Sequence, residues 1–132
     1  SAKVDFRLVP DMTPDAVLKG LRAHLDAGGF DDVTIDLLGG EPPARTDPDD
    51  PFVDLVCRTA EPVYGVPMQR VPMIGGSGPN HPFVHDLGLP VATAGLGHPG
   101  SLVHAPNENV RLDLYVKHAK HMARLLAAFA EP

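Results

Sequence analysis

The chain has 132 residues and a formal net charge of −6, with 43% hydrophobic and 5% aromatic residues. This length fits one ordinary domain or two small lobes, and the core must rest on Leu, Val and Ala because Trp is absent. The acidic balance argues against a nucleic-acid partner, which needs a clustered basic surface. No apolar run approaches the roughly 18–20 residues that span a bilayer, so we expect no membrane segment.

The chain contains a single cysteine, Cys57, and therefore offers no intrachain disulfide. Such usage is typical of a reducing compartment, and the first residues do not show the basic-then-apolar pattern of a signal peptide. We therefore expect a cytoplasmic protein. Cys57 lies in an apolar helical pattern with no obvious base beside it, which favours a packing residue over a catalytic thiol.

The first forty residues read as strand, helix and strand. Residues 3–8 alternate between apolar and polar side chains, which predicts a half-buried strand. A helix should follow between Thr13, a natural N-cap, and Gly28, with Pro14 at its first position. Residues 31–40 alternate again and predict a second strand. Such a β-α-β unit has too little surface to be stable alone.

The middle of the chain begins with a linker, residues 41–50, which is dense in Pro and Asp. A helix is expected from Pro51, and Pro62 should end or kink it because an interior proline costs about 3 kcal/mol. Further on we expect strands at 68–74 and 90–96 and a short helix at 83–87.

The last helix, expected to start near Asn107–Asn109, has the clearest pattern, with apolar residues at three- and four-residue steps. The apolar positions are Leu112, Tyr115, Val116, Ala119, Met122, Ala123, Leu126 and Phe129. The opposite side carries Lys117, His118, Lys120, His121 and Arg124. It is most simply a solvated face. His118 and His121 could share a metal ion, but isolated histidines with this spacing on a basic face seldom do.

A glycine-rich segment follows a predicted strand and consists of Gly75, Gly76, Ser77 and Gly78. Because glycine lets the main chain approach a ligand closely, its backbone N–H groups could receive an anion, and Ser77 could add a hydroxyl. The segment lacks the Lys of a P-loop, and Ser77 has no base beside it as a nucleophile would require. A tight structural turn fits equally well.

Two further side chains could contribute to a site. His104 precedes Asn107 and Glu108, which could orient its imidazole or cap the next helix, although a surface histidine is the plainer interpretation. A lone histidine cannot hold a catalytic zinc ion, which usually has three protein ligands. Arg7 could grip a carboxylate through two parallel hydrogen bonds, or pair at the surface with Asp5 or a cross-strand acid.

Four segments, in order, resemble the second half of a zinc peptidase family: KVDFRLVPDMTPDAV, GGEPPARTDPDDPF, GGSGP and LVHAPNENVRLDLYVKHAKHMARLL. The family includes carnosinase, cytosolic dipeptidases, aminoacylase and acetylornithine deacetylase, and the carnosinase type looks closest. The resemblance covers essentially the whole chain. It implies an α/β fold in which residues 1–43 form half of a lid domain, which commonly makes a homodimer. Residues 44–132 would be the C-terminal sheet-and-helix part of the catalytic domain.

The resemblance also implies roles for single residues. His104 matches the last zinc ligand, and Ser77 with its neighbouring glycines matches the loop that holds the substrate's terminal carboxylate. Arg7 matches an arginine that reaches the same carboxylate when the lid closes. Asn107 and Glu108 match the residues that follow and support the ligand.

Leu38 departs from the family pattern. Carnosinase-like members carry a histidine just before the glycines of this segment, where the present chain has Leu38. Substrate contacts at this position therefore do not carry over, and the exact substrate stays open.

The implied reaction is hydrolysis of an amide bond near a free carboxylate, in a small peptide or an N-acyl amino acid. Family members use two zinc ions, or other divalent metals, to activate water and polarise the scissile carbonyl. Their other ligands and the general base belong to an N-terminal part that this chain does not match. We therefore expect a fragment without catalytic residues of its own, inactive alone. The alternative is a non-catalytic oligomerisation or anion-binding module.

Overall fold

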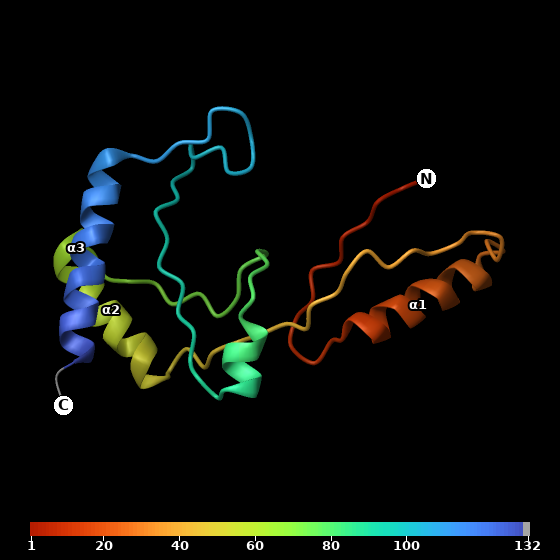
Figure 1. The fold of residues 1–132 in the computed structure, drawn as a ribbon, viewed down its shortest axis with the longest axis horizontal. Helices are drawn as coiled ribbons and strands as arrows, with labels where there is room; N and C mark the ends of the chain where they lie inside the picture. Colours follow the sequence, from red (N-terminus) through yellow and green to blue (C-terminus); the bar gives the residue numbers. More distant parts are fainter. Residues whose placement is uncertain (131–132) are drawn as a thin grey trace. The chain divides into compact units, whose positions relative to one another are not determined.

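The computed structural model describes residues 1–130 and divides into two compact units. Unit 1 comprises residues 1–46 and 72–91, and unit 2 comprises residues 47–71 together with the chain from residue 92 onward. The helical elements in chain order are α1 (Pro14–Ala27), α2 (Pro51–Tyr64), the π-helix η1 (Pro82–Asp86) and α3 (Leu112–Phe129) (Figure 1). None of them is long and apolar enough to cross a membrane.

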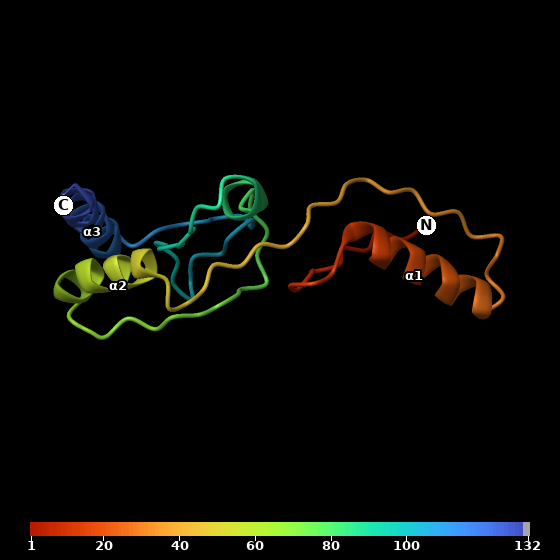
Figure 2. The same cartoon turned by 90° about the horizontal axis from the view of Figure 1, so that it is seen from below.

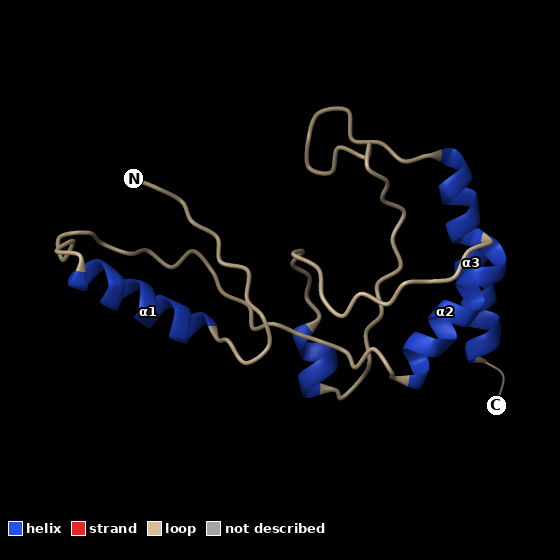
Figure 3. Ribbon diagram, turned by 180° about the vertical axis from the view of Figure 1, so that it is seen from behind, coloured by secondary structure: helices blue, strands red, loops and turns tan. Residues whose placement is uncertain are grey.

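All regular structure in residues 1–130 is helical, so the predicted α/β fold with its sheet is wrong (Figure 3). The segment 3–8 was expected to be a half-buried strand, yet Val4 and Phe6 are 64% and 50% exposed. The alternation of apolar and polar residues predicts only on which face of a strand each side chain would lie. A strand also needs a neighbouring segment whose N–H and C=O groups complete a ladder, and the described segments do not provide one.

Unit 1 is built around α1, whose limits follow the sequence. The hydroxyl of Thr13 accepts a hydrogen bond from the backbone N–H of Ala16 at 3.1 Å, Pro14 takes the first helical position, and Gly28 caps the C-terminus. These observations confirm the predicted cap, start and end of the helix.

After α1 the chain turns back along the helix (Figures 1 and 2). The guanidinium of Arg22 donates to the carbonyls of Val33 at 2.5 Å and Phe30 at 2.8 Å, which fixes the turn to the helix. At the other end of α1, a Cβ on Gly40 would lie 2.7 Å from the Cβ of Pro14. Only glycine therefore allows the returning segment to pass so close to the first turn.

Unit 2 contains α2 and α3, which lie side by side (Figures 1 and 2). The carboxylate of Asp50 caps α2 by accepting from the N–H of Phe52 at 2.7 Å. The helix continues past Pro62 to Tyr64, and Gly65 ends it with a left-handed φ of 76°. Of the two effects predicted for Pro62, an end of the helix is wrong, because the left-handed glycine and not the proline stops the helix.

The face of α3 that packs against α2 differs in part from the prediction, although Phe129 of the expected apolar face does contact Phe52 of α2, with ring centroids 6.2 Å apart. His121 is 1% exposed, and its Nε2 lies 3.2 Å from the carbonyl of Val56 on α2. By contrast, Leu112 and Leu126 of the expected apolar face are 76% and 71% exposed. The interpretation of the opposite side as a solvated face is therefore wrong for His118 and His121, whereas Lys120 and Arg124 are exposed as expected. Burial lowers the pKa of His121, which favours the neutral ring at this helix contact.

Candidate functional site

The site residues predicted from the sequence fall into two sets. Arg7 and the glycine loop, residues 75–78, belong to unit 1, whereas His104, Asn107 and Glu108 belong to unit 2.

In unit 1 the chain brings together Arg7 and Ser77, which are seventy residues apart. Nη1 of Arg7 donates a hydrogen bond to Oγ of Ser77 at 2.5 Å, and both side chains are exposed. None of the ion pairs of residues 1–130 involves Arg7, so the expected alternative partner, Asp5, is not used. The contact leaves a positive guanidinium without a neutralising carboxylate beside the glycine loop.

The glycine loop has open space around it. A Cβ added at Gly75 would meet nothing within 4 Å, and at Gly76 or Gly78 it would make only ordinary contacts of 3.5 Å or more. None of these glycines has a positive φ. Neither backbone conformation nor packing within the described residues therefore requires glycine here. The absence of side chains does keep the main-chain N–H groups accessible to an anion.

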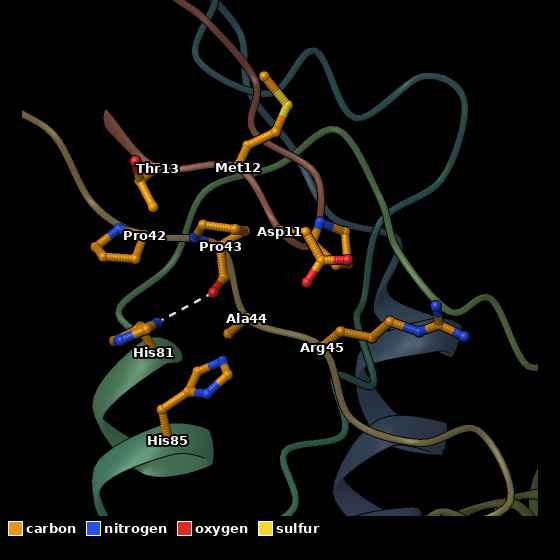
Figure 4. A pocket seen from close by; sticks show the side chains of 10 residues that line it. Asp11, Met12, Thr13, Pro42, Pro43, Ala44, Arg45, His81 and His85 are labelled. Carbon is orange, nitrogen blue, oxygen red and sulfur yellow. Dashed lines mark hydrogen bonds between the residues drawn. The ribbon is translucent and has the colours of Figure 1, made fainter. Parts of the chain in front are cut away.

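A cavity of about 310 Å³ lies near η1 in unit 1 (Figure 4). Nδ1 of His81 lies 3.1 Å from the carbonyl oxygen of Pro43 and must donate to it, because a carbonyl only accepts. The ring of His85 stacks on that of His81 with centroids 4.3 Å apart. Asp11, with a left-handed φ of 68°, also lines the cavity. Sequence reasoning missed these histidines, and no predicted site residue lines the cavity.

In unit 2, His104 is exposed on a loop with an unusual backbone. Leu102, His104 and Asn107 have φ values of 51°, 62° and 66°, in the left-handed region. For a residue other than glycine this conformation costs roughly 1–2 kcal/mol, although asparagine adopts it more readily. Such strain persists only where surrounding bonds hold the backbone, and it is common at functional sites.

Glu108 and Asn107 contribute to this loop in different ways. The Glu108 carboxylate accepts from the backbone N–H of His104 at 3.4 Å, and the Asn107 carbonyl accepts from the side chain of Asn109 at 3.1 Å. Neither side chain caps the helix. Accordingly α3 begins at Leu112, later than the expected Asn107–Asn109.

A catalytic zinc site usually needs three protein ligands that lie close together. Within residues 1–130 no three His, Cys, Asp or Glu side chains are grouped so that they could hold a metal ion. The exposed imidazole of His104 makes no hydrogen bond to any of these residues, so it fits one ligand of a site completed by others. His24 and Asp26 have the His-x-Asp spacing of a ligand pair. On α1, however, Asp26 is paired with Arg22 at 2.6 Å.

His118 and His121 do not form a metal pair with a third ligand either. Their rings meet edge to face with centroids 6.2 Å apart. His121 instead contacts the carbonyl of Val56 and the ring of Tyr64, whose centroid lies 6.1 Å away. It is a buried contact between the two helices.

Comparisons with known proteins place the chain. The sequence model of Peptidase family M20/M25/M40 matches residues 3–128. The chain belongs to this family. A crystal structure of an M20 family metallo-carboxypeptidase from Sulfolobus solfataricus is 36% identical, with a TM-score of 0.75. The match covers 90% of the present chain and 28% of that protein, so the chain spans little more than a quarter of the relative's length. A search of curated proteins found no match.

Membership of the M20/M25/M40 family confirms the zinc-peptidase resemblance at the level of the family. It agrees with a metal-dependent hydrolase, because M20 metallopeptidases typically use zinc. The closer resemblance to carnosinase-type dipeptidases stays a prediction, as do the roles of the single residues.

Proposed function

We propose that this chain is part of a zinc-dependent amide hydrolase of the dipeptidase or deacylase type, in which it binds the substrate's free carboxylate and supplies one zinc ligand. The observation that carries the proposal is the hydrogen bond between Arg7 and Ser77 beside the open glycine loop. Family membership gives the class of reaction.

The Arg7–Ser77 pair offers donors that match a carboxylate. A guanidinium has five N–H donors, and one of those of Arg7 is used on Ser77. The Ser77 hydroxyl accepts that bond, so its own hydrogen can be donated elsewhere. A carboxylate placed against the glycine loop would then accept from the remaining guanidinium N–H groups, from Ser77 and from backbone N–H groups.

A carboxylate grip suits enzymes that cut next to a chain end. The Sulfolobus relative is called a metallo-carboxypeptidase, and a carboxypeptidase acts beside a free terminal carboxylate by definition. For the present chain we propose a small peptide or an N-acyl amino acid as substrate. Holding one end of such a molecule sets the position of its amide bond, which lowers the entropic part of the barrier.

His104 would be one ligand of a two-zinc site, with Asn107 and Glu108 supporting the loop that carries it. Zinc, when bound, would polarise the scissile carbonyl and increase the acidity of water. Residues 1–130 do not group three ligand side chains, and the proposal assigns the other ligands and the general base to sequence outside these residues. The isolated chain is therefore proposed to be inactive alone. From the family resemblance we also propose a homodimer formed through residues 1–43 in the complete enzyme.

Calorimetric titration of the chain with an N-acetyl amino acid, and with the same compound as its amide, tests the carboxylate grip. We expect the acid to bind and the amide not to bind. Arg7→Ala should remove the difference, whereas Lys3→Ala, which removes another cation of the same segment, should keep it. Equal binding of acid and amide would contradict the proposal.

Hydrolysis assays with added zinc test the enzymatic part. We expect no turnover by the isolated chain and zinc-dependent turnover by the complete enzyme. Carboxylate binding without turnover in the complete enzyme would instead favour an anion-binding module. Robust zinc-dependent turnover by the isolated chain would contradict the proposed division of the site.

A further inference from the structure

The loop that carries His104 is closed by one side chain, that of Asn109. Its Nδ2 donates to the carbonyl of Gly100 at 2.9 Å and to that of Asn107 at 3.1 Å. Its backbone N–H donates to the carbonyl of Ser101 at 3.0 Å. Asn109 thus ties the start of the loop to its end, and residues 98–109 form a short closed loop.

The ring of His98 completes the closure. Its Nε2 lies 3.1 Å from Oδ1 of Asn109, which can only accept, so Nε2 carries the proton. The backbone N–H of Gly100 then donates to the unprotonated Nδ1, also at 3.1 Å. One tautomer of the neutral ring satisfies both bonds, and the same orientation of the Asn109 amide satisfies all three of its own contacts.

The base of the loop is also held at Ser101, which is 6% exposed. Its hydroxyl accepts from the backbone N–H of His98 at 2.9 Å, and its own N–H donates to the carbonyl of His98 at the same distance. The left-handed backbone of His104 lies inside this closed frame. The backbone conformation sets the direction of the Cα–Cβ bond and limits the rotamers of a side chain, so whatever fixes the frame also limits the directions that the His104 imidazole can take.

We propose that Asn109 and His98 are positioning residues, which hold the 98–109 loop in the strained conformation that directs His104 toward the metal. The inference rests on the proposed function in that it takes His104 as a zinc ligand. Neither residue is required to touch zinc or substrate. Their effect on zinc is indirect, through the backbone and rotamer of His104, in the way that supporting residues orient metal ligands.

The first test concerns the loop and needs no metal. In the ¹⁵N-labelled chain, NMR should show His98 as the tautomer with the proton on Nε2. Asn109→Ala should weaken that preference and raise the hydrogen-exchange rates of the amides of Ala105 and of residue 109 at least tenfold, while α2 and α3 keep their shifts. A proton on Nδ1 in the wild type, or unchanged exchange in the variant, would overturn the inference.

The second test measures zinc affinity of the complete enzyme by competition with a chelator. Asn109→Ala should weaken zinc binding by roughly 10- to 100-fold, the range found for residues that support metal ligands. It should lower kcat and leave KM unchanged. Asn109→Asp should not rescue the loss, because a carboxylate cannot donate to the carbonyls of Gly100 and Asn107. Asn80→Ala, which removes the same amide in unit 1, should leave zinc affinity unchanged.

Two further variants separate the possible failures. His98→Gln can keep a donor near Asn109 but has no acceptor at the position of Nδ1 for the N–H of Gly100, so it should weaken zinc binding less than Asn109→Ala does. If His104→Ala weakens zinc binding while Asn109→Ala and His98→Gln do not, the positioning role is wrong and the proposed function stands. If His104→Ala leaves zinc affinity unchanged, both are wrong.

Discussion

The two candidate regions of the molecule are held in opposite ways. Arg7 meets Ser77 across seventy residues through one hydrogen bond between exposed side chains. The 98–109 loop is held by a network of bonds that each span at most eleven residues. Closing a long segment costs more entropy than closing a short one, although the cost rises slowly with length. The conformation of the 98–109 loop therefore depends on bonds within the loop, whereas the contact between Arg7 and Ser77 depends on the folding of unit 1.

The largest effect should come from removing the proposed ligand of the self-contained loop. In the complete enzyme, His104→Ala should lower kcat by more than the roughly 10- to 100-fold typical of supporting residues, because zinc itself is lost. Activity and zinc content measured together check this. His24→Ala, an exposed histidine of α1 in unit 1, is the control. Full activity with unchanged zinc in His104→Ala would exclude His104 as a ligand.

The carboxylate pair should show a different kinetic pattern. Arg7→Ala should raise KM and lower kcat/KM by roughly 10- to 100-fold, because hydrogen bonds to charged groups contribute about 1.5–3 kcal/mol. Arg7→Lys keeps the charge but not the fork and should recover only part of the loss. Steady-state kinetics with a carboxylate substrate would measure this. A fall in kcat alone would place Arg7 outside carboxylate binding.

Unit 1 should be sensitive to the contact that fixes its turn. Arg22→Ala removes the bonds to the carbonyls of Val33 and Phe30 and should destabilise the turn by about 1–2 kcal/mol. Hydrogen exchange of the amide of Val33, which bonds to the carbonyl of Phe30, reports the loss. Lys19→Ala, on the same helix, should leave that exchange rate alone. If both variants behave alike, Arg22 does not fix the turn.

A substitution in the strained 98–109 loop should stabilise the chain, in contrast to Arg22→Ala. Leu102 is 51% exposed with a φ of 51°, so Leu102→Gly removes strain and little packing and should stabilise the chain by about 1 kcal/mol. Its neighbour Val103 is 58% exposed and has no left-handed φ, so Val103→Gly should destabilise slightly. Chemical denaturation compares the two. Destabilisation by both changes would show that the loop is not strained at Leu102.

The smallest effect concerns acidification of unit 2, because it involves one imidazole. The pKa of His121 is lowered in the folded chain, mainly by burial, from an ordinary value of 6.5. The unfolded chain therefore binds the proton more readily. The neutral His121 ring therefore contributes to the free energy of unfolding fully above pH 6.5, and this contribution is lost as the pH falls through the lower pKa of the folded chain. His121→Gln should flatten this part of a stability–pH curve; an unchanged slope would exclude His121 as the cause.

Local signals in the sequence predicted the helices well. Thr13, Pro14 and Gly28 set the limits of α1, and Pro51 starts α2, because capping depends on a few adjacent residues. The sheet was mispredicted because alternation at residues 3–8 says nothing about a ladder partner. The face of α3 was mispredicted at His121 because its ring lies against the carbonyl of Val56 on α2, a contact that periodicity cannot reveal.

The candidate site was predictable only in part. Neither spacing nor composition pairs Arg7 with Ser77, and the two were associated through the family resemblance before the structure brought them into contact. His98 and Asn109 were missed, although an asparagine that closes a Gly- and Pro-rich segment is a recognisable signal for side-chain bonds to backbone carbonyls. His81 and His85 gave no such signal, since their stacking depends on the short π-helix.

The exposed side of α3 has a practical consequence for every experiment in solution. Four apolar side chains of this helix are at least 45% exposed and form an apolar surface on its outer side: Leu112, Tyr115, Val116 and Leu126. Exposed apolar surfaces of this kind favour association with other protein molecules and with other apolar surfaces. Self-association would change the measured binding and hydrogen exchange. These measurements should therefore be repeated at several protein concentrations.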